Sequence, residues 1–249
     1  MQELIVITLV FLLAGYVKGV IGMGLPTIAM ATLGLLLAPV QAAALLVIPS
    51  MVTNVWQFAA GQAKWATFRR LWPMLLFVCL GTWWGIGLLT ASTSAWPSLW
   101  LGSVLALYAL VALFLPKLSM SLHHEKWLAP IVGLLTGILT GATGVFVIPA
   151  VPFLSAMNLS KDELIQALGL SFTVSTLALA LSLGFHATYS KEDLLLSVLA
   201  VLPAMLGMWV GQTTRNKIDP MTFRKCFFGA LFLIGAYMAV RAGYSLMGR

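Results

Sequence analysis

Lys18 is a basic residue in an otherwise apolar segment, which reads GYVKGVIGMGLP over residues 15–26. A charged side chain at the bilayer centre costs about 3 kcal/mol even on insertion scales, so charges placed there usually serve a function. An ammonium attracts anions, and the glycines beside it let the backbone approach a ligand closely. We therefore predict that Lys18 contacts an anion, although a lysine can also extend to the membrane surface.

Helix N-termini are a second feature that favours anions, because their unpaired N–H groups and positive dipole end suit an oxyanion. Two apolar segments, 3–37 and 129–156, are too long for one helix and are interrupted by glycine and proline. Each is expected to hold two half-helices of about 14 residues, too short to cross a hydrocarbon core of ~30 Å. The residues expected where the second half-helices begin are Gly22, Gly24, Thr27, Gly141, Thr143 and Gly144.

Two further expected helices carry polar side chains at helical spacing, so that the side chains of each helix share one face. Hydroxyl and amide donors bind sulfonyl or carboxyl oxygens, but they also form hydrogen bonds between membrane helices. We include them in the candidate site with both roles open. They are Ser50, Asn54 and Gln57 on the helix over 42–60, and Ser171 and Ser175 on the helix over 164–186.

Acidic residues are missing from the interior of the expected spans. Sites for multivalent cations and intramembrane proton relays usually need carboxylates at depth. We therefore expect no metal, no cofactor and no magnesium nucleotide. The seven acids lie at the N-terminus or in expected loops: Glu3, Glu125, Asp162, Glu163, Glu192, Asp193 and Asp219.

Ser182 and His186 lie one helical turn apart, a spacing that also occurs in hydrolases. The sequence has no G-x-S-x-G elbow, and no third residue that could orient the histidine is evident. An intramembrane hydrolase built on this pair is therefore a minor alternative, and we expect that the protein is not an enzyme.

The composition places the chain in a membrane. Of its 249 residues, 61% are hydrophobic and 8% are charged, and apolar runs of helix-spanning length recur along the whole sequence. We expect an all-α polytopic membrane protein with one membrane domain over residues 1–249. The apolar N-terminus lacks a basic n-region and a cleavage site, which favours mature chain over a signal peptide. The basic residues lie in short loops rather than in a patch, which excludes nucleic acid as the expected partner.

The broken segments open two similar halves of the chain. Gly15, Gly19 and Gly22 align with the G-x-x-x-G-x-x-G pattern of the second break at an offset of 122 residues, and later positions align at 125 and 126. We predict a first repeat over 3–115 and a second over 129–246. Each would be a broken helix hairpin followed by three spanning helices, with the six ordinary spans at 42–60, 72–89, 98–115, 164–186, 194–213 and 221–246. The alignment places Thr140 opposite Lys18, and we include it in the candidate site.

The distribution of lysine and arginine predicts the topology. If each broken segment enters and leaves on the same side, the basic residues in loops divide ten to three between the faces. If both broken segments cross once, the division is eight to five. The positive-inside rule favours the first arrangement, with both termini outside and two repeats of inverted topology.

The paired breaks, the KGVIGMGLP stretch from residue 18 and the PSMVTNVWQ stretch from residue 49 resemble the TauE/SafE family of sulfite exporters. The resemblance covers residues from about 4 to 240. It implies passage of small organosulfur anions or sulfur oxyanions across a bacterial inner membrane.

The leading hypothesis is a secondary transporter of sulfite or of sulfonates such as sulfoacetate. Lys18 would attract the charge, half-helix N-termini would bind the oxygens, and Asn54 and Gln57 would orient the ligand. The alternative transport hypothesis is an anion-selective channel, which could use the same groups without alternating states. The expected partners are a small anion and the lipid bilayer, and a homo-oligomer is compatible with the sequence.

Overall fold

The computed structural model describes residues 2–90, 95–114, 119–186 and 190–247, which fold entirely into helices and connecting segments. Eight stretches of these residues are long and apolar enough to cross a membrane, and they include all six ordinary spans expected from the sequence. The helices are α1 (Gln2–Ile21), α2 (Leu25–Leu33), α3 (Pro39–Ala59), α4 (Lys64–Thr90), α5 (Trp96–Phe114), α6 (Leu122–Thr143), α7 (Ala150–Ala156), α8 (Lys161–Phe185), α9 (Lys191–Leu199), α10 (Val201–Thr214) and α11 (Pro220–Met247). Helices α9 and α10 together make one span over Glu192–Thr214.

Both broken segments are interrupted where glycine and proline predict, but their arms are unequal. The first arms, α1 and α6, have 20 and 22 residues and are long enough to span a membrane. The second arms, α2 and α7, have 9 and 7 residues. The expectation of four short half-helices is therefore wrong, because nothing upstream of either break stops the first arm from extending over a full span.

Left-handed backbone conformations explain why the first arms end where they do. Gly22 and Gly24 have φ angles of 79° and 112°, and Gly144, the C-cap of α6, has a φ of 71°. Glycine adopts these angles without the steric penalty that a side chain adds. Pro26 then lies in the first turn of α2, where a missing N–H is tolerated.

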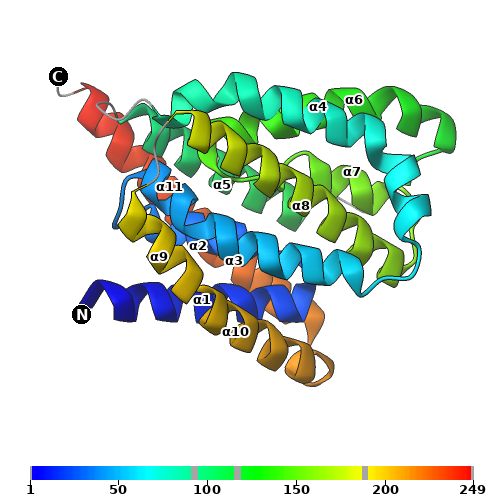
Figure 1. Cartoon of the computed structure of the whole chain (residues 1–249), viewed down its shortest axis with the longest axis horizontal. Helices are drawn as coiled ribbons and strands as arrows, with labels where there is room; N and C mark the ends of the chain where they lie inside the picture. The colour runs from blue at the N-terminus through cyan, green and yellow to red at the C-terminus, as the bar shows by residue number, and fades with distance from the viewer. Residues whose placement is uncertain (1, 91–94, 115–118, 187–189, 248–249) are drawn as a thin grey trace.

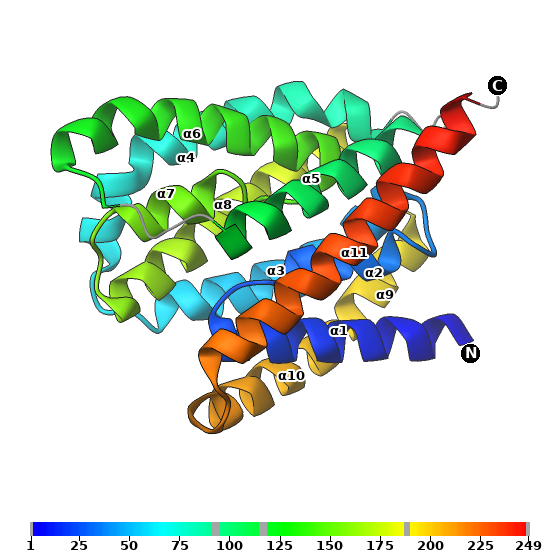
Figure 2. The ribbon, with the colours of Figure 1, turned by 180° about the vertical axis from the view of Figure 1, so that it is seen from behind.

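The helices pack as pairs drawn from distant parts of the chain. Helix α4 lies beside α6, α1 beside α10, and α3 beside α8, and α5 packs against α11 on the other face (Figures 1 and 2). The two termini lie at the same end of the molecule, and the α3–α4, α7–α8 and α10–α11 connections lie at the opposite end (Figure 1). Helix α1 runs away from the terminal end and α2 returns toward it (Figure 2).

Close packing at glycines makes the α1–α10 and α6–α4 interfaces equivalent. A Cβ atom on Gly15 would collide with the carbonyl oxygen of Ala204, and one on Gly137 would collide with the carbonyl oxygen of Val78. Gly15 and Gly137 are 122 residues apart, and Val78 and Ala204 are 126 apart, which are the offsets of the sequence alignment. The same offsets relate three further contacts: Gly19–Met208 to Gly141–Thr82, Gly207–Leu12 to Gly81–Leu134, and Gly211–Tyr16 to Gly85–Ile138.

The outer surface carries large apolar side chains. Trp84, Phe185 and Leu233 are each more than two thirds exposed, and many similar residues cover the outward faces of the helices. An exposed apolar surface of this extent would drive aggregation in water, but it suits contact with lipid. The bundle is therefore apolar outside, and ten of the seventeen buried polar side chains of the described residues lie on α1, α3 and α8.

Candidate functional site

Lys18 lies near the end of α1 with its side chain buried. Its ammonium donates to Thr53 Oγ1 at 3.0 Å and to Asn54 Oδ1, both on α3. An ammonium has three protons, and the hydrogen bonds recorded for the described residues use two of them. Both partners are neutral, so the described part of the chain gives this charge no carboxylate partner.

Asn54 is oriented by the lysine. Its Oδ1 faces the ammonium, and its Nδ2 donates to Ser50 Oγ at 3.0 Å and to Thr176 Oγ1 at 3.4 Å. The Ser50 and Thr176 hydroxyls are themselves 3.2 Å apart. The predicted face of α3 therefore exists, but Ser50 and Asn54 use their polar atoms to hold Lys18 rather than leave them free.

Thr53 and Thr176 belong to this network and were missed by sequence reasoning. Thr53 lies three residues after Ser50, a spacing that also shares a helix face, so its position was a usable signal. Thr176 follows Ser175 directly, and an error of one position rotates a helical side chain by about 100°. Each threonine donates its own proton to a carbonyl four residues earlier, which leaves its oxygen able to accept.

Gln57 links the first break to α8 by hydrogen bonds. Its Nε2 donates to the carbonyl oxygens of Gly22 at 3.0 Å and Ile165 at 2.8 Å. The N–H of Gly22 in turn donates to the carbonyl of Lys18 at 2.7 Å. The Oε1 of Gln57 is buried and accepts no hydrogen bond from the residues that the structure describes.

The N-terminus of α2 contributes donors beside the break. Gly24 is its N-cap and provides no side-chain cap, so the first turn keeps free backbone N–H groups. Thr27, in that turn, is fully buried, and its hydroxyl has no hydrogen-bond partner among the described residues. The hydroxyl of Tyr108 contacts Met23 Sδ at 3.3 Å and helps to fix the loop between α1 and α2.

The second break differs from the first. Gly141 and Thr143 lie in the last turn of α6 and Gly144 caps it, whereas α7 begins only at Ala150. The prediction that these residues open a half-helix is therefore wrong, because residues 144–149 separate the two helices. A helix C-terminus carries the negative end of the dipole and does not favour an anion.

The other predicted residues of the second half do not join the Lys18 network through the hydrogen bonds recorded for the described residues. Thr140 donates to the carbonyl of Thr136 at 2.7 Å, and the buried hydroxyls of Ser171 and Ser175 have no partner in the described part of the chain. The aligned positions explain the asymmetry, because Thr53 and Asn54 correspond to Ala178 and Leu179 at the offset of 125. The second half therefore lacks both the cation and the groups that hold it.

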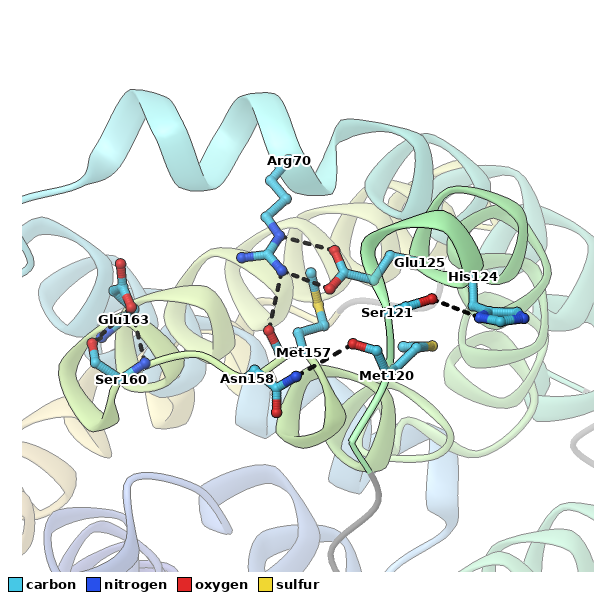
Figure 3. Close-up of polar contacts among 9 residues, drawn as sticks. All are labelled: Arg70, Met120, Ser121, His124, Glu125, Met157, Asn158, Ser160 and Glu163. Atoms are coloured by element: carbon cyan, nitrogen blue, oxygen red, sulfur yellow. Dashed lines mark hydrogen bonds and ion pairs between the residues drawn. The ribbon is translucent and has the colours of Figure 1, made fainter.

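Arg70 and Glu125 form a second polar cluster (Figure 3). Arg70 Nε donates to one carboxylate oxygen at 3.0 Å and Nη2 to the other at 2.6 Å, and Nη2 also reaches the carbonyl of Met157 at 3.1 Å. Both residues fall outside the expected spans, but they lie in helices, because α4 begins at Lys64 rather than at 72 and α6 begins at Leu122 rather than at 129. A cavity of about 70 Å³ lies beside Arg70 and is also lined by Glu163.

The geometry of Ser182 and His186 does not support the hydrolase alternative. His186 Nδ1 lies 2.8 Å from the backbone carbonyl oxygen of Ser182, so this nitrogen must carry the proton and donate it. The contact is to the main chain rather than to the hydroxyl that a hydrolase would activate.

A family model described as "Sulfite exporter TauE/SafE" matches residues 7–238. No curated protein and no solved structure matched the chain. The matched range includes both breaks, Lys18 and the α3 residues that hold it.

Proposed function

Because the chain belongs to the sulfite exporter TauE/SafE family, we propose that it is a secondary transporter of a small sulfur-containing anion, such as sulfite or a sulfonate. Family membership and eight candidate spans make it a multi-pass membrane transporter. The observation that carries the choice of an anion is the buried ammonium of Lys18, whose partners are neutral. A transported anion supplies the missing counter-charge.

The free donors beside the first break define the binding groups. The third proton of Lys18 binds the charged oxygen, and the Thr27 hydroxyl and the first N–H groups of α2 bind the remaining oxygens. Hydrogen bonds to charged groups contribute about 1.5–3 kcal/mol each, enough to offset the cost of burying the ammonium. Asn54 then does not contact the substrate but positions Lys18, which does.

Burial of these groups supports a transporter over a channel. Lys18 and Thr27 are almost wholly enclosed, so an anion reaches them only when helices move apart. The equivalent α1–α10 and α6–α4 interfaces support two inverted repeats, and rocking of such repeats gives alternating access. A channel needs a continuous path instead.

The chain is proposed to lie in a bacterial inner membrane with both termini outside. The excess of lysine and arginine in the expected loops at one face supports this orientation. Paired C-terminal fusions to a fluorescent protein and to alkaline phosphatase test it. A fluorescent, phosphatase-inactive pair of fusions would place the C-terminus in the cytoplasm and reject the assignment.

Uptake by reconstituted vesicles tests the function. With the membrane potential held at zero, vesicles preloaded with unlabelled sulfite or sulfoacetate should accumulate the radiolabelled anion by saturable counterflow, whereas a channel gives no accumulation under this condition. Lys18→Met should abolish this uptake, and Lys64→Met, which alters an exposed lysine at the start of α4, should retain it. Folding of both variants is checked by gel filtration and helical circular dichroism. Counterflow by Lys18→Met at the wild-type rate, or absence of counterflow in the wild type, overturns the proposal.

A further inference from the structure

The amide nitrogen of Gln57 has two hydrogen-bond partners, whereas its amide oxygen has none among the described residues. Its Nε2 uses both protons on the carbonyl oxygens of Gly22 and Ile165, which fixes which end of the amide is nitrogen. Its Oε1 is buried and accepts no hydrogen bond from the described residues. A buried acceptor without a donor is unfavourable, so such an atom in a binding region indicates a ligand that donates to it.

This acceptor borders the same break as the ammonium. Gln57 lies one helical turn after Thr53, which binds Lys18, and it holds Gly22, whose N–H binds the carbonyl of Lys18. The break therefore presents one cation, one unpaired acceptor on Gln57 and one unpaired hydroxyl on Thr27. The ammonium donates hydrogen bonds to a ligand, the amide oxygen accepts them, and the hydroxyl can do either.

The charge of the site limits the net charge that a bound ligand can carry. The membrane interior of the described chain offers one ammonium here, which balances one negative charge. A dianion would leave a second charge buried without compensation, which is strongly unfavourable in a medium of low dielectric constant. A bare anionic oxygen would also face the lone pairs of Gln57 Oε1. A monoanion that carries an O–H or N–H group satisfies both the ammonium and the amide oxygen.

We propose that the transported species is a monoanion bearing a hydrogen-bond donor, with its charged oxygen on Lys18 and its donor on Gln57 Oε1; this rests on the proposed function. Sulfite is then carried as bisulfite rather than as the dianion. Hydroxyl-substituted sulfonates are preferred over plain alkyl sulfonates. Sulfoacetate, with two acidic groups, is carried with its carboxyl protonated.

Gln166 supplies a matched control. It lies on α8 and spans the same α3–α8 interface, donating from Nε2 to the carbonyl of Phe58 at 3.2 Å. Its Oε1 accepts from the N–H of Ala63 at 3.1 Å, so both ends of its amide are satisfied. Both glutamines therefore link the same two helices, but Gln57 has the free acceptor.

The test compares two ligands of equal charge and similar shape. Isethionate and propane-1-sulfonate each carry one sulfonate, and a hydroxyl in the first replaces a methyl group in the second. Each competes with radiolabelled bisulfite in counterflow into vesicles that contain the wild type. We expect isethionate to compete at least tenfold more strongly, equivalent to about 1.4 kcal/mol. In Gln57→Met the two should compete equally, and Gln166→Met should keep the wild-type preference.

The outcomes separate this inference from the proposed function. Equal competition by both sulfonates in the wild type, with uptake lost in Lys18→Met, leaves the transporter in place and overturns the donor requirement. A preference for isethionate that survives in Gln57→Met overturns the assignment to Gln57. Absence of bisulfite counterflow in the wild type overturns the proposed function and the inference with it. The wild-type comparison needs no variant, so it stands even if Gln57→Met fails to fold.

Discussion

The carbonyl oxygen of Asn54 accepts a hydrogen bond from the ammonium of Lys18, and no carboxylate of the described residues pairs with that ammonium. A neutral amide solvates a buried cation through its dipole but does not cancel its charge. The polar network around Lys18 is therefore held together without a counter-ion from the described residues. An arriving anion finds an ordered, unneutralised ammonium, which lowers the reorganisation needed for binding.

Asn54→Asp should place a tethered counter-ion at this position. The carboxylate keeps an acceptor for Lys18, so we expect a folded protein with a thermal midpoint close to the wild type. Its charge competes with the substrate, and anion counterflow should fall at least about tenfold, the effect of roughly 1.4 kcal/mol. Asn158→Asp makes the same change at an exposed residue between α7 and α8 and should leave counterflow unaltered. Wild-type affinity in Asn54→Asp would contradict an anion site at Lys18.

Glycine packing predicts that alanine substitutions at aligned glycines lower the stability of the protein by similar amounts. Gly15→Ala and Gly137→Ala each force a Cβ against a backbone carbonyl of the facing helix, at Ala204 and Val78. Overpacking of this kind costs about 1–3 kcal/mol, and the two losses should be similar because the contacts are equivalent. Gly229→Ala adds a Cβ in open space on α11 and should be neutral or stabilising by up to about 1 kcal/mol. Thermal unfolding in detergent measures all three, and unequal losses at the first two sites would argue against equivalent interfaces.

Local chemistry explains what the sequence predicted. Both breaks follow from glycine and proline in apolar runs, and the spans follow from hydropathy, because each depends on a short stretch of chain. The shared face of Ser50 and Asn54 follows from helical periodicity. These features needed no knowledge of which helices meet.

Features that depend on tertiary packing were not predicted. Two contacts fix the orientation of the Asn54 amide: its oxygen accepts from Lys18, and its nitrogen donates to Thr176 of α8. The pairing of Arg70 with Glu125 joins residues 55 positions apart, which no local pattern indicates. Gly141, Thr143 and Gly144 were assigned to the start of a half-helix, and the assignment failed because residues 144–149 separate the end of α6 from the start of α7.

The Arg70–Glu125 pair should contribute to stability through its buried carboxylate (Figure 3). The side chain of Glu125 is 7% exposed and that of Arg70 is 34% exposed, so solvent screens the pair only in part. A double-mutant cycle with Arg70→Met and Glu125→Gln should give a coupling of about 1–2 kcal/mol, between the values typical of exposed and buried pairs. The coupling is measured from unfolding midpoints at low and high salt. A coupling near zero in low salt would show that the bidentate contact does not stabilise the bundle.

Thr176→Val should weaken anion transport without touching the substrate. The change removes the hydroxyl that accepts from Asn54 and contacts Ser50, so the amide that holds Lys18 loses one of its supports. A lost hydrogen bond of this kind is worth about 0.5–1.5 kcal/mol, which predicts a rise in KM of about two- to tenfold with the maximal rate largely kept. Thr173→Val, one turn earlier on α8, removes a hydroxyl that bonds to the carbonyl of Gly169 and should leave KM unchanged. Equal KM values for the two variants would mean that the α8 hydroxyl does not position Lys18, and that the first repeat builds the site without help from the second.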